Sequence, residues 1–176
     1  MKNLRGKKIL IVIAYQDFQD DEYRVVSEYL GMLGAVIEVA SSSIGEARGV
    51  NSSLVEVNIL INDVNPYQHD ALVFIGGPGS VEYQYNETVL ELARQFIQSR
   101  KIVAAICIAP LILAKAGILS GKHATVWVGY ENEEYKELES SGAKYTGEPV
   151  TVDKHIITAN GPESATKFAE AISKEI

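Results

Sequence analysis

The chain has 176 residues, of which 47% are hydrophobic, so residues 1–176 fit one domain that can bury a core. The net charge of -7 argues against a non-specific grip on nucleic acid, and no apolar run reaches the ~18–20 residues that cross a bilayer. One cysteine and three histidines without ligand spacing predict no disulfide, no metal site and no cofactor. We expect a cytoplasmic protein with neither a nucleic-acid nor a membrane partner, because the N-terminus lacks the pattern of a signal peptide.

The first half of the chain alternates strand-like and helix-like segments. Residues 8–14 form an apolar run of strand length, and residues 19–33 carry apolar side chains at helical spacing. A second strand is predicted over 35–40, after the helix-ending Gly34. Residues 54–61 alternate less cleanly and predict a small antiparallel excursion, and 71–75 predict a third buried strand.

The same alternation continues to the end of the chain. A helix is predicted over 86–100, a strand over 102–106 and a short helix over 110–116. A short strand over 124–127 and an acidic amphipathic helix over 131–141 follow. The last elements are a hairpin and a closing helix, over residues 150–153, 155–159 and 162–175.

Continuous apolar strands separated by helices are typical of a mostly parallel sheet that is covered on both faces. The sequence therefore predicts an α/β protein with a three-layer α/β/α architecture. In such sheets the functional groups gather at the carboxyl ends of the strands. Three segments follow predicted strands in this way: 15–22, 76–80 and 107–110.

Cys107 lies where a buried strand is predicted to meet a helix. A lone cysteine is usually a small, inert core residue. A sharp strand-to-helix turn would instead expose the sulfur above the sheet, where the helix amides favour a thiolate. The spacing alone leaves both interpretations open.

Gly76 and Gly77 follow the third strand and allow close approach of the backbone to a neighbouring group. One interpretation is an oxyanion-type site in which the N–H groups of Gly77 and Ile108 converge near the sulfur. The other is a plain strand-to-helix turn. Nucleotide binding is disfavoured because the stretch lacks both the GxGxxG spacing and a phosphate-loop lysine.

Three carboxylates, Asp20, Asp21 and Glu22, open the first predicted helix, where negative charge is favourable. Helical geometry turns successive side chains by ~100°. At most one or two side chains of the run 19–22 can therefore face the strand ends, and capping explains the rest.

Taken together, these segments resemble the ThiJ/PfpI superfamily. The resemblance lies in Ala105–Pro110 (AICIAP), Asp70–Gly77 (DALVFIGG) and Asp17–Glu22 (DFQDDE), and it continues in Ala116–Lys122 (AGILSGK) and Ile157–Pro162 (ITANGP). It covers nearly the whole chain in the right order. It implies a flavodoxin-like sandwich related to class I glutamine amidotransferases, a reactive Cys107 and a homodimer or larger homo-oligomer. Activities described for the family are intracellular peptidase, glyoxalase or protein deglycase, and oxidative-stress sensing.

The chain departs from the family at the position after the cysteine. The peptidase branch has a histidine there, whereas this chain has Ile108, which cannot act as a base. His69, His123 and His155 fall before a strand, in a loop and in the hairpin turn, and each is expected at the surface. Peptidase activity is therefore not expected.

The family resemblance also suggests which side chains flank the sulfur. A glutamate that usually abuts the sulfur corresponds to Gln19, which can donate a hydrogen bond but cannot shuttle protons. Glu22 matches another acidic position of the peptidase branch and is the best remaining carboxylate. Trp127 corresponds to a pocket-facing position, although a core indole is an equal alternative.

The sequence therefore predicts a reactive, oxidisable elbow cysteine that acts in hydrolase, glyoxalase or deglycase chemistry on a small electrophile. The alternative is a redox sensor or binding protein whose reaction partner is an oxidant, and a third is a structural subunit. If the elbow forms, helix amides should lower the pKa of Cys107. The tyrosines at 15, 23, 83 and 85 suggest an interface, with Tyr15 or Tyr23 buried by a second copy of the chain.

Overall fold

A seven-stranded sheet forms the centre of the computed structural model, which describes residues 2–176. Its order is β11-β12-β8-β7-β1-β3-β6, and every pair is parallel except the antiparallel hairpin of β11 and β12. The five central strands follow the 2-1-3-4-5 order of flavodoxin-like sheets. The predicted fold class is therefore confirmed. The strands are β1 (Lys8–Val12), β3 (Val36–Ser41), β6 (Ile59–Leu60), β7 (Ala71–Phe74), β8 (Ile102–Ile106), β11 (Val150–Asp153) and β12 (Ile156–Ala159).

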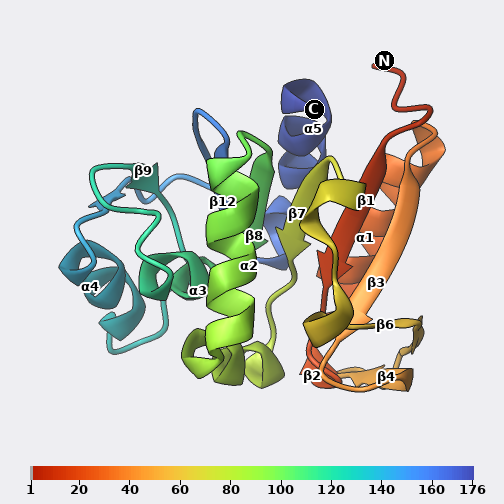
Figure 1. Cartoon of the computed structure of the whole chain (residues 1–176). Helices are drawn as coiled ribbons and strands as arrows, with labels where there is room; N and C mark the ends of the chain where they lie inside the picture. The colour runs from red at the N-terminus through yellow and green to blue at the C-terminus, as the bar shows by residue number, and fades with distance from the viewer. Residues whose placement is uncertain (1) are drawn as a thin grey trace.

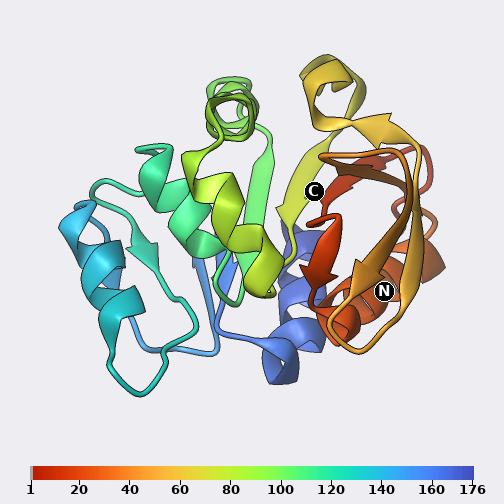
Figure 2. The same cartoon turned by 90° about the horizontal axis from the view of Figure 1, so that it is seen from below.

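Helices cover both faces of the sheet, as Figures 1 and 2 show. One face carries α1 (Asp20–Met32) and α5 (Ala165–Glu175), and the other carries α2 (Glu87–Gln98) and α3 (Pro110–Lys115). Side chains of β1 alternate between the two cores, with Leu10 and Val12 on the α2 side and Ile9 and Ile11 on the α1 side. This two-sided burial explains why the central strands are continuous apolar runs.

A three-stranded sheet stands at the carboxyl end of β1, at the bottom of Figure 1. It contains β2 (Gln16–Phe18), β4 (Gly45–Gly49) and β5 (Leu54–Val57), and β4 and β5 pair antiparallel. The predicted antiparallel excursion is therefore confirmed for residues 54–57. Residues 59–60 instead extend the main sheet as β6, and β2 and β4 are strands that the sequence pattern missed.

The remaining elements lie at the periphery. The strand predicted over 124–127 is shorter, because β9 (His123–Ala124) pairs only with β10 (Lys144–Tyr145). Beyond it, the backbone N–H of Trp127 donates to the carbonyl of Cys107, so this segment attaches to the cysteine turn. The acidic helix is α4 (Glu133–Ser140). Short 3₁₀ turns occupy Ile61–Asp63, Pro66–Gln68, Pro78–Tyr85 and Pro162–Ser164.

The parallel strands β1, β7 and β8 end at the same edge of the sheet. The segments that follow them, residues 15–22, 76–80 and 107–110, therefore meet there. This is the edge at which the sequence places the functional groups.

Candidate functional site

Cys107 occupies a strained elbow between β8 and α3. Its φ is 64°, a left-handed conformation that residues other than glycine rarely adopt. Two backbone hydrogen bonds hold it there: its N–H donates to Ala159 O at 2.9 Å, and its carbonyl accepts from Trp127 N at 2.8 Å. The neighbouring strand β12 and the 125–128 segment thus fix the turn that carries the sulfur.

Two backbone amides point at this sulfur, those of Gly77 and Ile108. Gly77 has a φ of 102°, and a Cβ there would lie 2.5 Å from Asp17 O. A Cβ on Gly76 would lie 2.5 Å from the Cβ of Cys107. Glycine is therefore required at both positions, because a side chain on Gly76 would collide with the elbow and one on Gly77 would collide with the backbone of residues 17–19.

Glu22, on the first turn of α1, is the carboxylate beside the sulfur. Its side chain is fully buried, and Oε2 accepts a hydrogen bond from the Gly76 N–H at 2.9 Å. Among the described residues, Oε1 is buried without a hydrogen-bond partner. A proton on Oε1 would turn this orphaned acceptor into a donor.

The acidities of Glu22 and Cys107 are coupled. Burial raises the pKa of Glu22 to about 7, against hydrogen bonds with the Gly76 amide and the Cys107 thiol. Burial, with the negative charge of Glu22, raises the pKa of Cys107 to about 12, although the amides of Gly77 and Ile108 favour the thiolate. The expectation of a lowered pKa at Cys107 is therefore wrong, because burial and the neighbouring carboxylate outweigh the two amides. A thiolate near neutral pH requires the proton to stay on Glu22.

Gln19 has a different place from the one that the family resemblance suggests. Its side-chain oxygen caps α1 by accepting from the Glu22 N–H at 3.1 Å, and its own N–H donates to Gly76 O at 3.0 Å. The carboxylate that abuts the sulfur is thus Glu22, three residues further on. Gln19 orients the turn that carries it and also lines the cavity above the cysteine.

A cavity of about 430 Å³ opens above Cys107. Its wall is mostly apolar and includes Trp127, whose side chain is 43% exposed, so the indole is not a core residue. Three lining residues escaped the sequence analysis: Val50, Val81 and Glu134. They come from the 49–53 turn, the 3₁₀ turn Pro78–Tyr85 and the acidic helix, whereas Pro78 belongs to the segment 76–80 predicted from the sequence.

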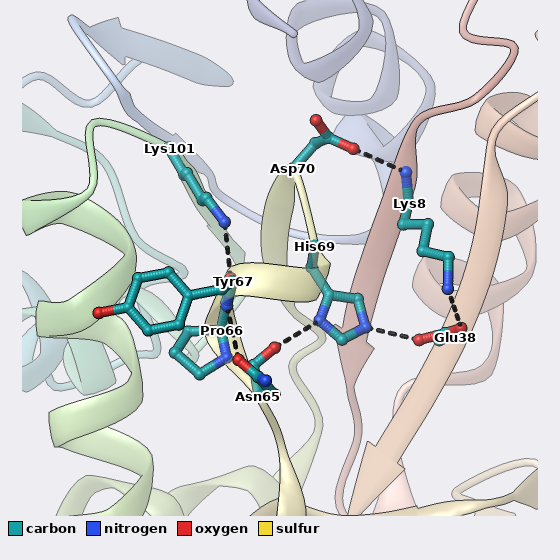
Figure 3. Close-up of polar contacts among 8 residues, drawn as sticks. All are labelled: Lys8, Glu38, Asn65, Pro66, Tyr67, His69, Asp70 and Lys101. Atoms are coloured by element: carbon teal, nitrogen blue, oxygen red, sulfur yellow. Dashed lines mark hydrogen bonds and ion pairs between the residues drawn. The ribbon is translucent and has the colours of Figure 1, made fainter.

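The histidines lie away from the sulfur. His155 is exposed in the hairpin turn, and His123 is exposed beside Asp153. His69, however, is only 3% exposed, so its expected surface position is wrong. Its ring contacts Glu38 and Asn65, as drawn in Figure 3. Nε2 lies 2.6 Å from a carboxylate oxygen of Glu38, and Nδ1 lies 3.3 Å from Asn65 O. This network stands beside the amino end of β7, the opposite edge from Cys107.

Two other features concern metal and membrane binding. Within residues 2–176, no three His, Cys, Asp or Glu side chains are grouped to hold a metal ion. In the same part of the chain, no helix is long and apolar enough to cross a membrane.

Comparison with known proteins gives one consistent match. The model of the DJ-1/PfpI family matches residues 7–175. The uncharacterized protein MJ0967 of Methanocaldococcus jannaschii is 40% identical over 99% of this chain and 85% of its own length. Deglycase PfpI of Pyrococcus furiosus is 31% identical over 88% of this chain and 90% of its own. The crystal structure of a ThiJ/PfpI domain protein from Brachyspira murdochii has a TM-score of 0.91 and 31% identity, covering 99% of this chain and 97% of that one.

Proposed function

This chain belongs to the DJ-1/PfpI family, and from that premise we propose that it is a cysteine-dependent enzyme of the glyoxalase or deglycase type, acting on small carbonyl electrophiles. The observation that carries the proposal is the pairing of Cys107 with the buried Glu22 below an open cavity. A nucleophile beside a carboxyl group with a pKa of about 7 suits proton transfer at neutral pH.

The simplest substrate for this pair is a 2-oxoaldehyde. The thiolate of Cys107 adds to the aldehyde carbon, forming a C–S bond, and the carbonyl electrons move to oxygen. That oxygen takes the proton from Glu22, which gives a hemithioacetal and a carboxylate. The amides of Gly77 and Ile108 stabilise the thiolate and are the expected donors to the developing alkoxide.

The remaining steps use the same two side chains. Glu22 removes the proton from the former aldehyde carbon, the hydroxyl proton shifts between the two oxygens, and Glu22 protonates the adjacent carbon. The product is a Cys107 thioester of a 2-hydroxy acid. Water, deprotonated by Glu22, hydrolyses it and restores the thiolate and the protonated carboxyl group. One water is consumed, and no oxidant or reductant is needed.

Peptide hydrolysis fits this site less well. The peptidase branch has a histidine directly after its cysteine, whereas Ile108 stands at that position here and cannot transfer a proton. Among the residues described as lining the cavity there is no histidine. We therefore expect no significant peptidase activity.

Turnover of methylglyoxal by purified variants tests the proposal. Cys107→Ala should abolish the activity, and Glu22→Gln should lower kcat/KM by about 10²–10⁴-fold, the usual contribution of a positioned proton-transfer group. Asp21→Asn is the matched control, because Asp21 is exposed on the same helical turn and pairs with Arg24. It should retain wild-type activity.

Activity that survives Cys107→Ala would place the chemistry elsewhere and refute the proposal. Absent turnover, together with conversion of Cys107 to sulfinic acid by peroxide, would favour the redox-sensor alternative.

A further inference from the structure

Asp20 is a buried carboxylate that takes no part in the chemistry proposed above. It is 6% exposed, and its two oxygens accept hydrogen bonds from two amides of the same turn. The Asn51 N–H donates to Oδ2 at 2.8 Å, and the Ser53 N–H donates to Oδ1 at 2.9 Å. Burial alone would raise the pKa of Asp20, but these hydrogen bonds hold it below its usual value.

The turn over residues 49–53 is fitted closely around this carboxylate. A Cβ on Gly49 would lie 2.5 Å from the carboxyl carbon of Asp20, so a larger residue there would displace the contact. The turn closes on itself through Gly49 N–H to Ser53 O at 2.9 Å. Asp20 thus replaces the solvent that a surface turn would otherwise bind.

This turn presents Val50 to the cavity above Cys107. The Val50 N–H donates to Phe18 O at 2.9 Å, and its side chain is 48% exposed at the cavity wall. The first turn of α1 therefore contributes to the cavity in two ways: Glu22 lies beside the sulfur, and Asp20 holds the turn that carries the wall residue Val50. Asp21, between them, points to solvent.

We propose that Asp20 is a positioning residue, which fixes Val50 as the wall that limits the size of electrophile able to reach Cys107. The inference deepens the proposed function, because it assigns substrate size to a residue outside the reacting pair. It predicts that small, unbranched electrophiles reach the sulfur readily and that bulky ones are admitted only when the wall is moved or trimmed.

Alkylation rates test the wall without requiring turnover. The chain has one cysteine, so every modification reports on Cys107. Iodoacetamide and its N-benzyl derivative share a reacting group and differ in bulk. Val50→Ala should raise the bulky-to-small rate ratio by about tenfold, the lower end of what a methylene in an apolar pocket contributes. Asp20→Asn should raise it in the same direction, because an amide can accept from only one of the two turn N–H groups through its single oxygen. Asp21→Asn should leave it unchanged.

Amide hydrogen exchange tests the positioning itself. In Asp20→Asn, the Asn51 and Ser53 amides should exchange faster than in the wild type, while strand amides of β1 and β8 keep their protection. Gly49→Ala should reproduce this result by displacing the same carboxylate.

A rate ratio in Asp20→Asn equal to that of Asp21→Asn, or unchanged exchange at residues 51 and 53, would overturn the proposal. Resistance of wild-type Cys107 to both reagents would instead refute the reactive cysteine of the proposed function, and the exchange experiment would still decide the role of Asp20.

Discussion

At the scale of single residues, the site depends on the protonation of two neighbouring groups, the buried Glu22 and the half-buried Cys107. Burial and then the negative charge of Glu22 raise the pKa of Cys107 to about 12, so the group is a neutral thiol near neutral pH. We expect the reactive form to be the pair that has lost one proton and keeps the other on Glu22, whose own pKa is about 7, so that the thiolate faces the two amide donors.

This pair predicts the pH dependence of activity. Below about pH 7 both groups are protonated, and as pH rises through the pKa of Glu22 the pair loses its first proton. The kcat/KM for methylglyoxal should therefore rise as the pH passes about 7 and then reach a plateau. The pH profile of Glu22→Gln should lack this rise. Stopped-flow or coupled assays between pH 5 and 9 measure it. A rise with the same midpoint pH in Glu22→Gln would show that the titrating group is not Glu22.

At the scale of elements, the sequence predicted best where an apolar run has one interpretation. The runs at 8–14, 71–75 and 102–106 appear as β1, β7 and β8, because strands buried on both faces admit few polar residues. β4 (GEARG) was missed because two glycines and two charged residues carry no strand signal, and its pairing with β5 comes from tertiary contact.

The site shows the same division between local pattern and spatial contact. The sequence brought Cys107, Gly76, Gly77 and Ile108 together, because strand ends of a parallel sheet share one edge. It could not decide whether Gln19 or Glu22 lies beside the sulfur, because Gln19 caps the helix whose first turn carries Glu22. Only the packing of Glu22 against Gly76 selects Glu22. Nor could the sequence predict that Val50 lines the cavity, because the turn that carries Val50 has no recognisable motif.

At the scale of the whole molecule, the distribution of apolar side chains bears on assembly. Tyr83, suggested from the sequence as an interface residue, is instead in the core, where its hydroxyl donates to Ile13 O at 2.9 Å. Tyr15 and Tyr23 stay partly exposed. Ile44 and Leu54 are each about half exposed at the small sheet: the Tyr15 hydroxyl donates to Ile44 O just before β4, and Leu54 begins β5.

We predict a homodimer that buries this surface, since two-fold symmetry is the commonest assembly for such a chain. Light scattering at micromolar concentration should give twice the monomer mass of 19.2 kDa. Leu54→Glu should shift the protein toward the monomer. Met32→Glu is the control and should not do so, because Met32 is 79% exposed at the C-terminal end of α1, away from this surface. A monomer mass for the wild type at every concentration would contradict the prediction.

Because the chain has a single cysteine, alkylation can test directly whether Cys107 is the nucleophile of a catalytic cycle. Partial carboxamidomethylation with iodoacetamide, quantified by intact mass, gives preparations with known fractions of modified Cys107. We predict that methylglyoxal turnover falls in proportion to the modified fraction and reaches zero when every chain is modified. Wild-type turnover by fully modified protein would show that Cys107 is not the nucleophile.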